Sequence, residues 1–381
     1  MNGFTFESRT RIVFGGGAVA RLEEQIGSLG EGAVLLVTDP GVRGAGLLER
    51  ATSGLDAAGR RWHVFDEVEA DPLDTTMERG AAALAAAGAR VVVGLGGGSA
   101  IDTAKGIALL ATNGGRIRDY VGRDRVRTVP MPVLAVPTTA GTGAEVSGNI
   151  AVTEAESHTK LSVRSPLNQP PVAVLDPALL ATLPTGVAAQ TGIDALSHAV
   201  EGYLSRLASP MTDRMALEAI GIGVTDLAAF VGDRGDAARA GRLLYASMLG
   251  GMIISNAPTG IDHALGRALG GAFGVPHGQA VGLFLPPTLR FNAPALPHKV
   301  AALRALFEGC PPRAPSHDNG EAVAAHVEAL VRALGMPTRL RELGVASAHL
   351  PALAAVAARN TGANIRPASE TQLLALLEEV A

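Results

Sequence analysis

The feature that most constrains the fold is a change of pattern near residue 178. Before it, alanine-rich stretches alternate with short apolar runs: AVLLVT (33–38), RVVVGL (90–95), VLAV (133–136) and VAVL (172–175). Runs that are apolar on both faces are typical of strands covered by helices on each side. Strand–helix alternation of this kind predicts an α/β domain with a parallel sheet.

After residue 187 the strand signal disappears, and the pattern predicts helices at 187–206, 212–231, 236–256, 320–334 and 368–380. Pro177 and Pro184 lie where the pattern changes, and proline is typical of boundaries between elements. We therefore expect an α/β domain over residues 1–180 and an all-helical domain over residues 181–381. A cleft between two such domains is a favoured place for a ligand.

Composition excludes several classes of partner. The chain has 381 residues and a net charge of −4, which argues against a nucleic-acid partner because such proteins need a basic surface. No basic run adjoins an apolar helix, and no run of about 18 apolar residues predicts a membrane span. Cys310 is the only cysteine, so an internal disulfide is excluded. With no leader pattern at the start, we expect a cytoplasmic protein.

Three glycine-rich turns are candidates for binding phosphate. Gly15, Gly17 and Ala20 match a dinucleotide fingerprint, with Asp39 following at the end of the next apolar run. That match alone is weak.

The second turn is stronger, because an apolar run leads into Gly96, Gly97 and Gly98. Glycines allow close approach of the backbone, and a helix N-terminus attracts an anion. Ser99 is expected to open the helix with Asp102 three residues on, in a capping arrangement. A tight strand-to-helix turn without ligand is the alternative.

The third turn follows VLAV and contains Thr138, Thr139 and Thr142 between glycines. Hydroxyls and bare backbone suit polyphosphate or ribose, although a loop capped by its own hydroxyls has the same composition. Two such turns after neighbouring strands favour a dinucleotide site at the carboxyl ends of the strands.

Four side chains in the helical half suggest a metal site. Asp194 and His198 are four residues apart and share one face of an apolar helix, where a carboxylate without a partner would be costly. His263 and His277 lie in later apolar segments. A single histidine there is more often a satisfied core residue, but one carboxylate and three imidazoles together suit Fe²⁺ or Zn²⁺.

These motifs together resemble the iron-containing (group III) alcohol dehydrogenase family. The resemblance is carried by GGGSAIDTAK (96–105), PTTAGTGAEV (137–146), Asp-x-x-x-His (194–198) and His…PHG (263–278), and it runs nearly end to end. It implies the two-domain architecture shared with dehydroquinate synthase, often a homodimer. It also implies metal ligation by Asp194, His198, His263 and His277, and pyrophosphate binding at 96–99 rather than 15–20.

The resemblance also implies where the cofactor lies. Asp39 matches the position beside the adenosine ribose, where a carboxylate accepts from the ribose hydroxyls and repels a 2′-phosphate, so NAD(H) is expected rather than NADP(H). Lys160 matches a cofactor-contacting lysine, and Asn149 joins the threonines as a lesser candidate. Asp71 stands where relatives commonly carry asparagine.

Arg267 departs from the family pattern. Many relatives carry a histidine at this position, four residues after the third ligand, whereas arginine stays protonated and cannot easily relay protons. One interpretation is that Arg267 turns outward or pairs with a carboxylate. Our hypothesis is that it binds an anionic group of the substrate, such as a carboxylate, phosphate or phosphonate.

The function expected from the resemblance is hydride transfer between NAD(H) and a small alcohol, aldehyde or ketone at a bound Fe²⁺, with Zn²⁺ or another divalent ion possible. A maleylacetate-type or phosphonate-pathway reductase is an alternative within the family. A sugar-phosphate cyclase would perform a lyase reaction, but such enzymes typically begin the metal set with glutamate. A nucleotide-binding protein without activity is the non-enzymatic alternative.

Overall fold

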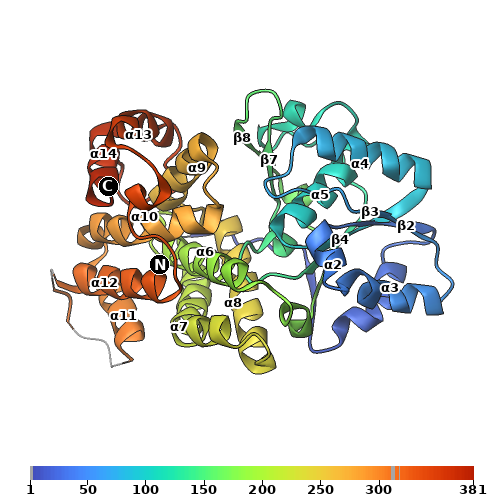
Figure 1. The fold of residues 1–381 in the computed structure, drawn as a ribbon, viewed down its shortest axis with the longest axis horizontal. Helices are drawn as coiled ribbons and strands as arrows, with labels where there is room; N and C mark the ends of the chain where they lie inside the picture. Colours follow the sequence, from blue (N-terminus) through green and yellow to red (C-terminus); the bar gives the residue numbers. More distant parts are fainter. Residues whose placement is uncertain (1–2, 310–313, 317) are drawn as a thin grey trace. The chain divides into compact units, whose positions relative to one another are not determined.

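The computed structural model describes residues 3–309, 314–316 and 318–381 (Figure 1). Cys310 lies outside the described residues. The chain divides into two compact units. The α/β unit comprises Ser8–Leu183 and Arg234–Leu244, and the helical unit comprises Met1–Glu7, Pro184–Asp233 and Tyr245–Ala381. The two-domain division predicted from the sequence, 1–180 and 181–381, stays a prediction.

A six-stranded sheet forms the centre of the α/β unit. Its order is β1 (Arg11–Phe14), β9 (Val172–Leu175), β6 (Val133–Pro137), β4 (Ala89–Gly96), β2 (Ala33–Val37) and β3 (Trp62–Phe65). Every neighbouring pair in this sheet is parallel. The three strands β2, β6 and β9 are buried along their whole length, which explains why their sequences are apolar on both faces. The predicted parallel sheet is confirmed.

Helices cover the two faces of this sheet. They are α1 (Leu22–Gly27), α2 (Pro40–Gly44), α3 (Leu47–Ala57), α4 (Asp74–Ala87) and α5 (Gly98–Asn113). Leu35 and Val37 of β2 pack with Leu84 of α4 and Ile107 of α5 in one buried cluster. Helix α3 lies on the other side of the strands (Figure 1).

A second, smaller sheet was not expected from the sequence. It contains β5 (Gly122–Arg123), β8 (Lys160–Arg164) and β7 (Asn149–Thr153), and β7 pairs antiparallel with β8. In β7, Ile150 and Val152 are buried and Ala151 between them is exposed. A short strand with one buried face carries a weaker sequence signal than the strands of the main sheet.

The strand order indicates which edge of the main sheet is expected to bind a ligand. Strand β2 has β3 on one side and β4 on the other, so the chain reverses its direction of travel across the sheet at the β2–β4 pair. Ligands of open parallel sheets bind outside the carboxyl ends of the strands at such a switch point. Asp39 follows β2 and Gly97 follows β4, so both lie at this edge.

The chain after residue 184 forms the predicted helices, and the first part of one of them, up to Leu244, belongs to the α/β unit. The described helices from Thr185 onward are α6 (Thr185–Tyr203), α7 (Pro210–Gly232), α8 (Ala237–Asn256), α9 (Ile261–Phe273), α10 (His277–Asn292), α11 (Pro297–Glu308), α12 (Asp318–Ala333), α13 (Leu350–Ala358) and α14 (Glu370–Glu379). The five helices predicted from the pattern are confirmed, with ends displaced by a few residues. Residues of α9, α10, α13 and α14 share a buried apolar cluster.

Helix α7 is the one described helix that is long and apolar enough to cross a membrane, with a mean hydropathy of 1.6 over its most apolar window. Of that window, 44% is buried inside the protein. A single helix of this kind is weak support for a span, because core helices can have the same length and composition.

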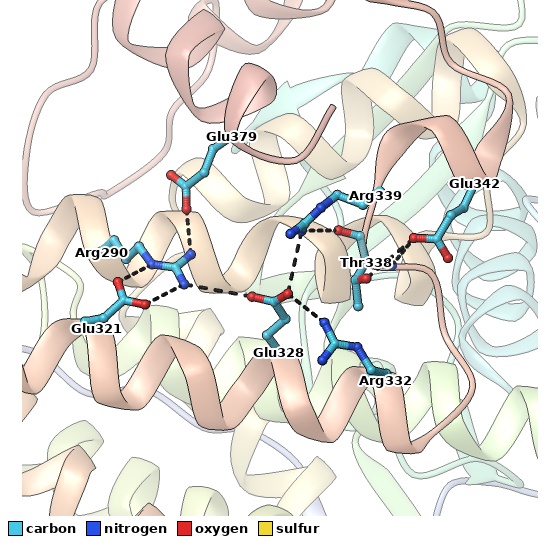
Figure 2. A network of polar contacts seen from close by, with 8 residues as sticks. All are labelled: Arg290, Glu321, Glu328, Arg332, Thr338, Arg339, Glu342 and Glu379. Atoms are coloured by element: carbon cyan, nitrogen blue, oxygen red, sulfur yellow. Dashed lines mark hydrogen bonds and ion pairs between the residues drawn. The ribbon is translucent and has the colours of Figure 1, made fainter.

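An ion-pair network ties the C-terminal helix to its neighbours (Figure 2). Arg290, near the end of α10, contacts Glu321 of α12 at 2.6 Å and Glu379 of α14 at 2.5 Å. A pocket of about 200 Å³ lies beside it, lined in part by Pro286, Pro287 and Val380. Arg290 is thirteen residues from His277, or about 20 Å along the helix. We assign this network a structural role in joining α14 to α10 and α12.

Candidate metal and nucleotide sites

The four predicted metal ligands come from three helices of the helical unit. Asp194 and His198 lie one turn apart on α6, His263 lies in the first turn of α9, and His277 is the first residue of α10. Asp194, His198 and His263 are 3–5% exposed. Three of the four predicted side chains are therefore buried in this unit, and His277 is partly exposed.

A glycine allows α10 to reach this position. A Cβ on Gly278 would lie 2.3 Å from the carbonyl oxygen of Gln190 in α6, a distance that real Cβ atoms do not adopt. Only glycine therefore lets the start of α10 lie against α6. This contact fixes the backbone next to His277.

The distances from Asp194 to the three histidines match those between ligands of one ion. Oδ1 of Asp194 lies 3.6 Å from Nε2 of His198, 3.5 Å from Nε2 of His263 and 3.6 Å from Nε2 of His277. In a tetrahedral site with bonds of about 2.1 Å, ligand atoms lie about 3.4 Å apart. The ligand atoms of Asp194, His263 and His277 all lie within 4.8 Å of one another, so these three can share a divalent ion, and Nε2 of His198 adjoins them through its 3.6 Å contact with Asp194.

Two of the predicted ligand atoms, Oδ1 of Asp194 and Nε2 of His263, are buried and have no hydrogen-bond partner among the described residues. Buried polar atoms without partners are costly, and a cation would satisfy both. One carboxylate and three imidazoles suit Fe²⁺ or Zn²⁺, so the residues fit the metal that the motifs imply.

The carboxylates and imidazoles around the predicted metal site stabilise one another's charged forms. Burial raises the pKa of Asp194, but the facing imidazoles of His198, His263 and His277 lower it more, to well below its usual range. Burial lowers the pKa of His263, but the carboxylates of Asp194 and Glu201 that face its ring raise it to about 10. The ring of His263 thus lies between two carboxylates, where a cation can replace a proton.

Of the four predicted ligands, His277 is the one whose side chain is exposed to solvent. Its side chain is 40% exposed, whereas the side chains of Asp194, His198 and His263 are 4–6% exposed. Catalytic metal sites keep one position open for substrate, while structural sites are closed by protein. The open side favours a catalytic role.

In the α/β unit, Asp39 and Gly96 lie side by side. Asp39 caps α2 by accepting from the N–H of Val42 at 2.9 Å. Gly96 has a φ of +153°, and a Cβ there would lie 2.7 Å from Cβ of Ala100 and 3.2 Å from Oδ2 of Asp39. The backbone conformation and the space both require glycine. The carboxylate of Asp39 is therefore close to the predicted pyrophosphate turn.

The threonine turn contacts the same glycines. A Cβ on Gly97 would lie 3.3 Å from Cγ2 of Thr139, and one on Gly98 would lie 2.7 Å from Cγ2 of Thr142. Thr138 is buried and donates its N–H to the carbonyl of Gly96 at 3.0 Å. The two turns predicted to bind the nucleotide are thus in contact.

The predicted capping arrangement at Ser99 is wrong. Helix α5 begins at Gly98 with Gly97 as its N-cap, so Ser99 is already inside the helix. Glycine has no side chain to occupy the first N–H groups, which leaves that end available to an anion.

Asp102 makes long-range contacts instead of a cap. Its Oδ1 accepts from Nζ of Lys105 at 3.0 Å and its Oδ2 accepts from the N–H of Ala151 at 2.9 Å. Burial raises the pKa of Asp102, opposed by the charge of Lys105. The ammonium of Lys105, which is 1% exposed, also donates to the carbonyl of Asn149 at 2.9 Å. Asp102 thus joins α5 to the small sheet, and its predicted contact with the cofactor stays a prediction.

The two remaining cofactor candidates lie on the small sheet. Asn149 begins β7 and accepts from the hydroxyl of Ser162. Lys160 begins β8 and pairs with Asp71 at 2.7 Å. Asp71 has a φ of +56°, a conformation in which asparagine and aspartate are enriched.

Comparison with known proteins matches both halves of the chain to one family. The model "Iron-containing alcohol dehydrogenase" matches residues 9–177, and "Fe-containing alcohol dehydrogenase family, C-terminal" matches residues 188–381. The chain belongs to the iron-containing alcohol dehydrogenase family. The family, the fold and the oxidoreductase class expected from the motifs are thereby confirmed.

Individual relatives in this family cover nearly the whole chain. A 1,3-propanediol dehydrogenase of Klebsiella pneumoniae is 35% identical over 96% of both chains. A solved 1,3-propanediol oxidoreductase is 34% identical with a TM-score of 0.96, covering 100% of both chains. A sulfoacetaldehyde reductase from Bifidobacterium kashiwanohense, solved with NAD⁺, is 25% identical over 100% of this chain and 99% of that one, with a TM-score of 0.88. None of these favours the lyase alternative.

Arg267, the departure from the family pattern, lies on the same helix as the predicted ligand His263. It is half-buried on α9, one turn after His263. Burial lowers the pKa of His277 to about 4, and the positive charge of Arg267 contributes to this decrease. The guanidinium is therefore near enough to His277 to act on its charge.

Sequence reasoning missed Glu201. It is 5% exposed on α6, and its Oε2 lies 2.7 Å from Nδ1 of His263. The signal was present, because Asp194, His198 and Glu201 follow a spacing of four and then three residues, which places them on one face of a helix.

Proposed function

We propose that this iron-containing alcohol dehydrogenase transfers hydride between NAD(H) and a small alcohol, aldehyde or ketone. Asp194, His198, His263 and His277 would hold the metal, with Fe²⁺ as the first candidate. The convergence of these four side chains, with Nε2 of each histidine 3.5–3.6 Å from Oδ1 of Asp194, carries the proposal.

The ligand set is suited to this chemistry. A bound divalent cation would polarise the oxygen of the alcohol or carbonyl substrate, and NAD(H) would accept or donate the hydride. One carboxylate and three neutral imidazoles leave half of the divalent cation's charge uncompensated, which favours polarisation. Asp194, His198 and His263 come from buried helix segments and hold their ring and carboxylate atoms in fixed positions.

The test is an anaerobic assay of the protein reconstituted with Fe²⁺ or Zn²⁺, in which NADH absorbance is followed with a panel of aldehydes, ketones and oxo-acids. We expect metal-dependent consumption of NADH with at least one carbonyl compound. Tight binding of metal and nucleotide without turnover on the panel would instead support the non-enzymatic alternative.

We expect a preference for NADH over NADPH because Asp39 stands beside the pyrophosphate turn. Replacing Asp39 with asparagine keeps an acceptor for the N–H of Val42 but removes the charge that repels a 2′-phosphate. The ratio of kcat/KM for NADH to that for NADPH should fall by about tenfold in this variant, or about 1.4 kcal/mol. Steady-state kinetics with both cofactors measures it. Faster turnover with NADPH in the unmodified protein would contradict the assignment.

We propose that Arg267 binds an anionic group of the substrate. Its charge lies near the exposed side of His277, and the name of one relative, sulfoacetaldehyde reductase, specifies an aldehyde that carries an anion. Arg267→Ala should lower kcat/KM for a carboxylated aldehyde by about 10- to 100-fold, as for loss of a charge-assisted contact, and change it little for a neutral aldehyde of equal length. Arg267→Lys, which keeps the charge, should retain part of the preference. Equal losses on both aldehydes would show that Arg267 has another role.

The remaining expectations are also proposals. The resemblance to the family supports a homodimer, and the composition supports a cytoplasmic protein with a small-molecule substrate and no nucleic-acid or membrane partner. The net charge of −4 is the observation behind the exclusion of nucleic acid.

A further inference from the structure

A second buried carboxylate lies behind the metal ligands. Oε2 of Glu201 contacts Nδ1 of His263 at 2.7 Å, on the side of the ring away from Asp194. Oε1 of Glu201 accepts from the N–H of Asp262 at 2.9 Å. Glu201 therefore contacts both the ring of His263 and the backbone just before it.

The same residues form a second group that could be taken for a metal site, since ligand atoms of Glu201, Asp262 and His263 lie within 4.8 Å of one another. Their hydrogen bonds argue against this. Both oxygens of Glu201 already accept hydrogen bonds, so this carboxylate has no unsatisfied oxygen to offer. Oδ2 of Asp262 is bonded to the hydroxyl of Ser197, whereas its Oδ1 has no hydrogen-bond partner in the described part of the chain. A second ion would also require His263 to lose both ring protons, whereas neutral imidazole is the usual ligand.

We propose that Glu201 is a positioning residue that keeps the proton of His263 on Nδ1. The lone pair of Nε2 is then free and faces Oδ1 of Asp194, 3.5 Å away. A carboxylate behind a histidine ligand fixes its tautomer and ring orientation, and strengthens it as a donor to the metal. This inference rests on the proposed metal site and adds Glu201 to it.

The experiment compares metal binding by the full chain with Glu201 intact and replaced by glutamine. The metal-free proteins are titrated with Co²⁺ against a competing chelator, and the visible absorption of the bound Co²⁺ is recorded. E201Q should bind Co²⁺ about 10- to 100-fold more weakly and show a shifted absorption band. Asp176→Asn is the matched control, because Asp176 is 0% exposed and also accepts backbone hydrogen bonds, but in the α/β unit. Its affinity and spectrum should equal those of the unmodified protein.

A second measurement needs no variant. In the Zn²⁺-loaded protein labelled with ¹⁵N-histidine, the NMR spectrum should show His263 protonated at Nδ1 and bare at Nε2. A proton on Nε2 would overturn the proposal, as would an E201Q variant with unchanged affinity and absorption. Two ions per chain, one of them lost in E201Q, would replace the proposal with a second metal site.

These outcomes are separate from failure of the proposed function. If the unmodified protein bound no metal, or bound metal without turning over NADH, the proposed function would fail. If it bound metal and consumed NADH while E201Q behaved identically, only the role of Glu201 would be lost.

Discussion

Replacing Asp194 with asparagine should abolish turnover while leaving the fold intact. Asp194 is the one anionic ligand, and its Oδ1 is within 3.6 Å of Nε2 of all three histidines. Asparagine keeps the shape but removes the charge that attracts the cation. We expect kcat/KM to fall by about 10³-fold or more, equivalent to about 4 kcal/mol of transition-state stabilisation. Metal content by elemental analysis should fall in parallel.

Two controls distinguish this result from misfolding. The unmodified protein treated with a chelator should lose activity to the same extent and regain it with Fe²⁺, whereas the asparagine variant should not regain it. The far-UV circular dichroism of both should match that of the unmodified protein. A variant that retained metal and more than about a tenth of the activity would contradict the role given to Asp194.

The second large effect is expected on stability in the α/β unit. Asp102 is the carboxylate partner of the ammonium of Lys105, whose side chain has no exposed surface. Asp102→Asn leaves that ammonium buried without its counter-charge, which should cost about 3–5 kcal/mol. The melting temperature of this unit should fall by about 10 °C. Trp62 is the only tryptophan and lies in β3, so its fluorescence reports the unfolding of this unit.

The matched control removes both charges. In Asp102→Asn combined with Lys105→Met, no charge remains unpaired, and replacement of a buried ion pair by neutral or apolar groups is often nearly neutral in stability. The double variant should therefore recover most of the lost melting temperature. A single variant that melts within about 2 °C of the unmodified protein would contradict the buried pair's importance.

The main sheet and the metal ligands could be predicted because their signals are local. Strands buried on both faces must be apolar throughout, so AVLLV and VAVL indicate strands without knowledge of their neighbours. Asp194 and His198 share a helix face by spacing alone. His263 and His277 joined this set as histidines of later apolar segments, and the resemblance to a family then implied that all four bind one metal.

The features that were missed depend on contacts distant in sequence. The spacing of Glu201 places it on the helix face of Asp194 and His198, but only the contact with His263, 62 residues later, shows what it does there. Asp102 was expected to serve the start of its own helix, but its partner Ala151 lies 49 residues away. The N-cap is Gly97 rather than Ser99, and at Gly98, the first residue of the helix, the close approach of Thr142 leaves no room for a side chain.

The proposed four-ligand metal site is tested most directly by anomalous diffraction at the iron absorption edge, from crystals grown anaerobically with Fe²⁺. We predict one iron per chain, within about 2.0–2.2 Å of Asp194 Oδ1 and of Nε2 of His198, His263 and His277. An anomalous peak elsewhere, or coordination that omits one of these four side chains, would contradict it.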